Sequence, residues 1–289
     1  MEKKKYTFTG VLIAILKSIG YIFIWLLVSS LVLTFVDVLL ALKYQSSTYE
    51  AIAKISASYG AHTIIISDIL TILIFCLIYK IKKVGISERC QIKTRSFGAY
   101  IKVILLGIMG QFAVQYMLAV LIPIMPQGWI DALQANNDSI ISASETMNII
   151  ATVIVAPILE EIMCRGLVQG ALRKAMPDWV SVLLSALIFG SLHTAWNDIS
   201  QINFIGIIYA FSFGLLLGFV AVKFDSILPA ILCHMAFNAT SLALVGELSG
   251  FALILLNLSV PILVVLIIRT AKHIEPKKEE YDDYDEDEE

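Results

Sequence analysis

Residues 156–167 read APILEEIMCRGL, and this stretch places three charged side chains inside an otherwise apolar run. The charges belong to Glu160, Glu161 and Arg165. At the centre of a bilayer each such side chain costs roughly 2.5–3.5 kcal/mol on insertion scales. This cost predicts that the three side chains face the interior of a helical bundle and serve a function there.

Two of these charges have the spacing of an ion pair. Glu161 and Arg165 are four residues apart, so on a helix they share a face and can pair. Glu160 lies about 100° around the helix and is left without that partner. A low-dielectric interior favours the neutral form of an unpaired carboxylate, which makes glutamate a usable general base. We therefore predict that Glu160 is the base; an ionic lock made by all three residues is the structural alternative.

The composition of the whole chain is that of a membrane protein. Of its 289 residues 58% are hydrophobic and 16% are charged, and the mean hydropathy is +0.82. This excludes an ordinary water-soluble domain and predicts the lipid bilayer, not nucleic acid, as the surrounding partner. The fold class is all-α, a polytopic transmembrane bundle of about eight helices. The apolar segments are Val11–Leu42, Ala61–Ile78, Ala99–Ile124, Met147–Val168, Val180–Thr194, Phe204–Val222, Ile227–Val245 and Phe251–Ile268.

The distribution of Lys and Arg predicts the orientation. Residues 80–95 carry six of them, whereas residues 126–146 carry none. By the positive-inside rule the first loop is cytoplasmic and the second is not. An even number of helices then places both termini in the cytoplasm of a multi-pass cell-membrane protein.

The chain divides into four parts by composition. Residues 1–146 hold the N-terminal transmembrane helices, the first of them retained and not a signal peptide. Residues 147–245 hold the polar motifs, 246–274 the final transmembrane helix, and 275–289 an acidic tail expected to be disordered.

Two further apolar segments carry polar groups at helical spacing. In IFGSLH, Phe189 and His193 are four residues apart, and in ILPAILCHMAFNAT so are His234 and Asn238. Side chains at this spacing project from one face of a helix. A single intramembrane histidine is equally typical of helix packing, but here three separate segments offer polar groups to the bundle interior.

Taken in order, these residues resemble the three motifs of the CAAX-protease and bacteriocin-processing (CPBP) family, also called the abortive-infection family. The motifs are Glu-Glu-x-x-x-Arg, Phe-x-x-x-His and His-x-x-x-Asn, and the resemblance covers residues 147–241. It implies an intramembrane endopeptidase that acts on a membrane-associated peptide or protein. Glu160 and His193 would then activate a water, His234 and Asn238 would stabilise the oxyanion, and the Glu161–Arg165 pair would support Glu160.

The sequence leaves two mechanisms open, one with a catalytic metal and one without. Glu160, His193 and His234 form a ligand set suited to Zn²⁺, and the family is often labelled a metalloprotease. The chain has no His-Glu-x-x-His helix, however. We prefer the metal-free mechanism.

The depths of these residues along their helices pose one difficulty. At about 1.5 Å per residue, Glu160 lies roughly 20 Å below the outer end of its helix and His234 about 10 Å above the inner end of its own. His193 would lie about 20 Å from the inner end of its helix, which is too far out. We predict that Pro177 and Asp178 begin this helix already inside the protein.

Two other functions compete with proteolysis. One is a non-catalytic regulator or scaffold that binds a membrane sensor or enzyme, with the polar cluster serving structure alone. The other is a proton-coupled transporter, because intramembrane Glu and His also form proton relays.

Overall fold

The computed structural model describes residues 6–45, 48–132, 145–194, 202–244 and 250–273. The acidic tail and most of the predicted exterior loop lie outside these ranges. Within them the regular elements are helices and no strand occurs, which confirms the predicted all-α class. The elements are α1 (Phe8–Tyr44), α2 (Tyr49–Ser58), α3 (Gly60–Ile81), α4 (Ile86–Arg89), α5 (Phe97–Leu121), η1 (Ile122–Ile124), α7 (Glu145–Ile149), η2 (Ile150–Val155), α8 (Ala156–Glu161), η3 (Ile162–Gln169), α9 (Gly170–Ala175), α10 (Asp178–Ser191), α11 (Phe204–Lys223), α12 (Ile227–Ala243) and α13 (Gly250–His273).

Each of the eight predicted apolar segments is helical over most of its described residues, but the helices are not equally long. Six described helical stretches are long and apolar enough to cross a membrane. The other two, α10 and α12, have 14 and 17 residues. At 1.5 Å per residue α10 extends about 21 Å, less than the roughly 30 Å of a hydrocarbon core. α10 carries Phe189 and α12 carries His234 and Asn238, whereas His193 follows the last residue of α10, and both helices pack against α11.

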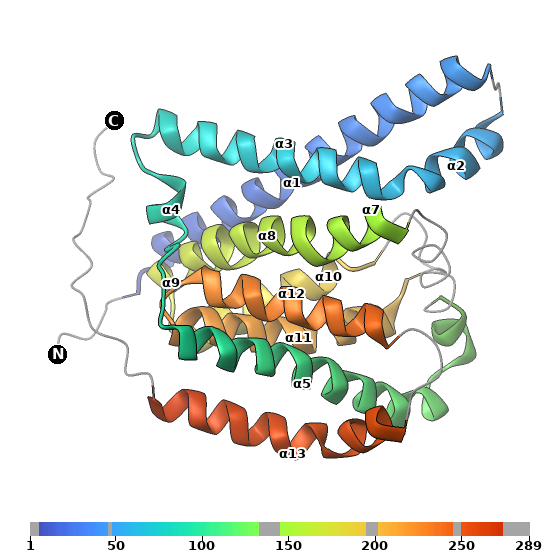
Figure 1. The fold of residues 1–289 in the computed structure, drawn as a ribbon. Coiled ribbons are helices and arrows are strands. Elements are labelled where there is room, and N and C mark those ends of the chain that lie inside the picture. Colours follow the sequence, from blue (N-terminus) through green and yellow to red (C-terminus); the bar gives the residue numbers. More distant parts are fainter. Residues whose placement is uncertain (1–5, 46–47, 133–144, 195–201, 245–249, 274–289) are drawn as a thin grey trace.

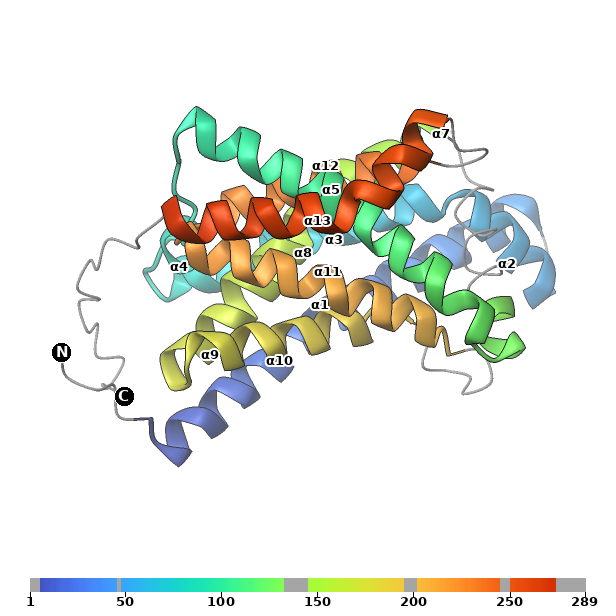
Figure 2. The same cartoon turned by 90° about the horizontal axis from the view of Figure 1, so that it is seen from below.

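The helices are arranged around α12 (Figure 1). This helix lies between α8 and α5 and contacts both, while α1 and α3 pair at one edge and α13 packs on α5 at the other. Figure 2 shows α11 running beside α10, which it contacts extensively. One hydrophobic core cluster joins residues of α5, η3, α11 and α12. The segment around α8 is therefore held from several sides by other helices.

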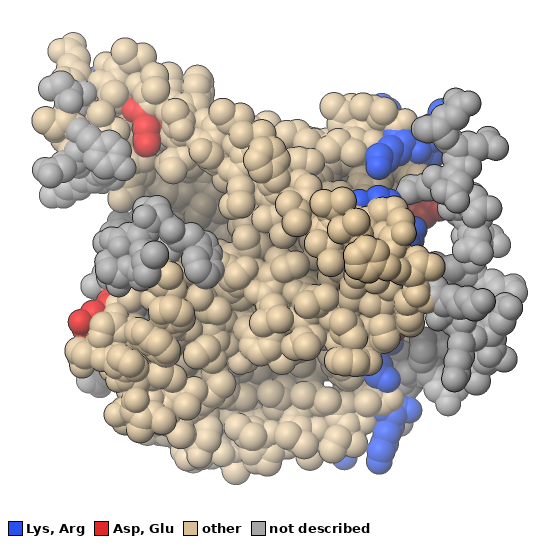
Figure 3. All heavy atoms as spheres, turned by 180° about the vertical axis from the view of Figure 1, so that it is seen from behind, with Lys and Arg blue, Asp and Glu red and all other residues tan. Residues whose placement is uncertain are grey.

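Positive charge gathers at one end of the bundle (Figure 3). Lys and Arg lie at the end where α3, α9 and α11 finish, with Lys80, Lys174 and Lys223 in their last turns. This is the pattern expected of a cytoplasmic face. That this end faces the cytoplasm stays a prediction.

A glycine allows the closest approach between α5 and α12. A Cβ atom added at Gly107 would lie 2.2 Å from the carbonyl oxygen of Cys233 and 3.0 Å from the Cβ of Ala236. Because neither of these atoms belongs to a flexible side-chain end, a larger residue must push the helices apart. Small residues such as glycine allow this close approach of backbones in the packing of membrane helices.

Replacing Gly107 by Ala is therefore expected to destabilise the protein by about 1–3 kcal/mol, the usual cost of overpacking. The midpoint of thermal unfolding in detergent reports the change. Gly98→Ala in the same helix is the matched control, because a Cβ there meets nothing within 4 Å. An equal stability of the two variants would show that this contact is not tight.

Candidate active site

The charged stretch lies on one continuous helical segment that changes its winding twice. α8 is flanked by two π-helical stretches, η2 before it and η3 after it. Glu160 and Glu161 are the last two residues of α8, immediately before η3. π-helical turns inside α-helices are rare and frequently occur at functional sites.

Glu161 and Arg165 form a buried ion pair. Arg165 Nη1 donates to Glu161 Oε1 at 3.0 Å, and neither side chain is exposed at all. Arg165 Nη2 also donates to the carbonyl oxygen of Gly214 on α11 at 3.1 Å. The guanidinium therefore neutralises Glu161 and anchors the segment to a second helix.

His234 lies between the two glutamates. Its Nδ1 is 2.9 Å from Glu161 Oε1, and its Nε2 is 3.7 Å from Glu160 Oε2. The sequence spacing gave Glu161 a single partner, Arg165, whereas the structure gives it two. Glu160 keeps a side chain that is 20% exposed, so it is the more accessible carboxylate of the two.

The structure does not place the start of α10 inside the protein. Arg173 Nε donates to Asp178 Oδ1 at 3.0 Å, and Arg173 Nη1 lies 4.0 Å from Asp225 Oδ1, just before α12 begins. The two helices thus begin at one level, and the Asp178 side chain is 52% exposed. The predicted start inside the protein is wrong.

Phe189 contacts both imidazole rings. Its ring centroid lies 4.4 Å from the His193 ring and 5.8 Å from the His234 ring. The guanidinium carbon of Arg165 lies over the same phenyl ring at 4.4 Å, within the range of a cation–π contact. Phe189 is therefore a common neighbour of His193, His234 and Arg165.

The backbone fixes the orientation of His193. Its Nδ1 lies 2.7 Å from the carbonyl oxygen of Phe189. A carbonyl oxygen only accepts, so Nδ1 carries the proton and Nε2 has a free lone pair in the neutral ring. His193 can accordingly accept a proton or orient a water through Nε2.

Two groups at the site were missed by sequence reasoning. Phe213 packs edge-on against His234 with ring centroids 5.1 Å apart, and Gly214 supplies the carbonyl that Arg165 uses. The pair Gly214 and Gly218 is a G-x-x-x-G signal of close helix approach. That signal shows a packing face but does not reveal which helix packs on it.

Asn238 replaces a backbone donor that a proline removes. Its Nδ2 donates to the carbonyl oxygen of Thr152 at 2.8 Å. In η2 the N–H of Ala156 bonds Ala151 five residues back, so the next bond of this pattern would join residue 157 to Thr152. Residue 157 is Pro, which has no N–H. Asn238 thus ties α12 to the exposed carbonyl of η2.

Replacing Asn238 by Leu is expected to destabilise the protein by about 1–3 kcal/mol, because the Thr152 carbonyl then loses its partner. In a Pro157→Ala background the new N–H can bond this carbonyl, so the same replacement should cost less. Thermal unfolding of the four proteins of this double-mutant cycle measures the difference. Equal costs in both backgrounds would contradict the assignment.

The predicted metal ligands do not converge. Glu160 and His234 approach each other, but among the described residues no group of three His, Cys, Asp or Glu side chains could hold a metal ion. The described residues as placed therefore do not fit a zinc site.

Fold and site together define a multi-pass membrane protein with a carboxylate–imidazole centre between its helices. Residues 142–240 match the family model described as "Rce1-like: Type II CAAX prenyl endopeptidase Rce1-like". This part of the chain is thus similar to the Rce1-like domains of the CPBP family, as the motifs predicted, and it contains all six predicted site residues. The family is one of membrane CAAX proteases, so endopeptidase activity is the supported function. The chain matches no curated protein and no solved structure.

Proposed function

We propose that this protein hydrolyses a peptide bond in a membrane-associated peptide or protein, with Glu160 as general base. The observation that carries the proposal is the placement of His234 between Glu160 and Glu161. A histidine held by one carboxylate and facing a second, partly exposed one is an arrangement for proton transfer.

The charged groups around a neutral His234 sum to one negative charge, so one additional proton would neutralise them. Arg165 offsets Glu161, so with a neutral imidazole the cluster has one excess negative charge, on Glu160. The Glu161 carboxylate accepts from Nδ1, which leaves Nε2 facing Glu160. A single proton between Glu160 and Nε2 would neutralise the cluster, as a low-dielectric interior favours.

In the proposed reaction Glu160 accepts a proton from water as the water oxygen attacks the scissile carbonyl carbon. His193 orients that water through its Nε2 lone pair. Protonated His234 donates a hydrogen bond from its Nε2–H to the developing oxyanion, and Glu161 holds the imidazole ring of His234 in place. Asn238 has a second N–H besides the one bonded to Thr152, and this donor would assist. The C–N bond then breaks, and the amine leaves with the proton taken up by Glu160.

The test compares membranes that contain wild-type protein with membranes that contain Glu160→Gln, which keeps the shape of the side chain and removes the base. Mass spectrometry of membrane-associated peptides should show uncut precursors that accumulate only with the variant. Their cleavage by added purified wild-type protein would identify them as direct substrates. If the two peptide inventories were the same, the protease assignment would fail and a scaffold role would replace it. Solute flux into vesicles without any cleavage would favour the transporter.

A further inference from the structure

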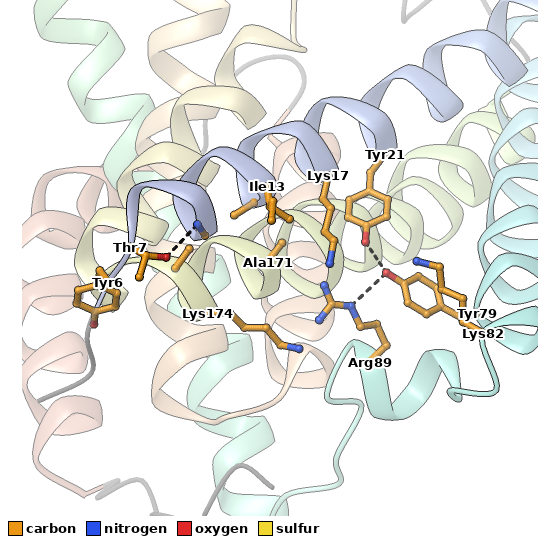
Figure 4. Close-up of a pocket in the computed structure, with 13 residues that line it drawn as sticks. Tyr6, Thr7, Ile13, Lys17, Tyr21, Tyr79, Lys82, Arg89, Ala171 and Lys174 are labelled. Carbon is orange, nitrogen blue, oxygen red and sulfur yellow. Dashed lines mark hydrogen bonds between the residues drawn. The ribbon is translucent and has the colours of Figure 1, made fainter. Parts of the chain in front are cut away.

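A polar cavity lies at the basic end of the bundle, lined by residues other than those of the candidate active site (Figure 4). It has a volume of about 150 Å³ and is formed where the start of α1 meets the end of α3, α4 and α9. A cavity that holds a single water molecule needs only about 10–15 Å³ of such volume. This cavity therefore has room for a phosphate-sized group. Its lining includes four cationic side chains: Lys17, Lys82, Arg89 and Lys174.

The charge of this cavity is of one sign. None of the described residues that line it is Asp or Glu. Figure 4 shows Lys17, Arg89 and Lys174 among the side chains that line this cavity. Several cationic side chains around one cavity produce a positive potential that attracts an anion.

Hydrogen bonds hold part of the cavity wall in place. The hydroxyl groups of Tyr21 and Tyr79 bond each other, and Arg89 Nε donates to Tyr79 at 3.1 Å. Tyr79 is buried, whereas Lys17, Lys82 and Lys174 are exposed. Three exposed lysines around an anchored guanidinium suit an anion that enters from the surface.

The neighbouring surface is apolar, which favours a lipid over a soluble anion. Ile13 lines the cavity and is 46% exposed, and Leu12 and Leu16 on the same helix are 45% and 57% exposed. A phospholipid presents a phosphate diester and acyl chains together, and basic pockets between membrane helices bind anionic headgroups. A free phosphate would use only the cationic half of this surface.

We infer that this cavity binds the phosphate headgroup of an anionic phospholipid, with the acyl chains along α1. The lipid would bridge α1, α4 and α9. Because α9 continues directly from η3, the bound headgroup would hold the helical segment that carries Glu160 and Glu161. This site does not depend on the protease assignment.

The experiment measures lipids retained by the purified full chain, by native mass spectrometry after reconstitution with equal amounts of phosphatidylglycerol and phosphatidylcholine. Wild-type protein should retain the anionic lipid with a preference of roughly 10-fold, as expected when several cations face one headgroup. The double variant Lys17→Gln with Lys174→Gln should lose this preference. Lys80→Gln, at the same end but outside the cavity, should keep it.

Three results would overturn the inference. Equal retention of the two lipids by wild-type protein would show that there is no anionic site. Unchanged preference in the double variant, with Lys80→Gln also unchanged, would place the site elsewhere. Displacement of the lipid by millimolar inorganic phosphate would assign the cavity to a soluble anion. Because the first result uses unaltered protein, a variant that fails to fold still leaves the inference testable.

Discussion

Glu160→Gln is expected to lower kcat for peptide hydrolysis by roughly 10²–10⁴-fold, the usual contribution of a positioned general base. The amide cannot take the proton of the attacking water, but it has nearly the same size and hydrogen-bonding reach. KM should therefore change little. Initial rates on a membrane-anchored peptide, measured with purified protein in lipid vesicles, give both constants.

The matched control for this prediction is Glu88→Gln. Glu88 is an exposed acid in α4, so its replacement should leave both kinetic constants near those of the wild-type protein. A Glu160 variant that cleaves at the wild-type rate would exclude Glu160 as the base. A change in KM alone would instead assign Glu160 to substrate binding.

Arg165→Met is expected to destabilise the fold by about 3–5 kcal/mol, because it leaves Glu161 charged and buried without its main counter-ion. Both side chains of this pair are fully buried, so water cannot replace the lost partner. Thermal unfolding in detergent measures the loss. Adding Glu161→Gln removes the unpaired charge, so the double variant should recover part of the lost stability.

An exposed ion pair provides the contrast. Lys93 Nζ lies 2.9 Å from Asp225 Oδ2, but the two side chains are 42% and 28% exposed. Lys93→Met should therefore cost only about 0–1 kcal/mol. If Arg165→Met cost no more than Lys93→Met, the buried pair would not hold the site together.

The long helices were predictable because each is a long apolar run, which can be recognised from consecutive residues without knowledge of the other helices. The short helices α2 and α4 were not predicted, since four to ten residues of mixed composition carry little periodic signal. The π-helical stretches η2 and η3 were also not foreseen. Their side chains follow a wider turn than the 100° per residue assumed, although Glu161 and Arg165 still meet.

At the candidate site, sequence spacing could place residues on one helix face but not across helices. The pairing of Glu161 with Arg165 is such a local relation. The bond from His234 to Glu161 and the contact of Phe189 with both imidazoles are not local, because they depend on how three helices pack.

Incorporation of ¹⁸O from labelled water in a single turnover tests the central claim most directly. Purified protein in vesicles is mixed with a membrane-anchored peptide in H₂¹⁸O, and the products are weighed by mass spectrometry. We expect one ¹⁸O atom in the new carboxylate of the product made by wild-type protein, and no such product with Glu160→Gln. Wild-type protein that forms no labelled product from the peptides that accumulate in membranes with Glu160→Gln would contradict it.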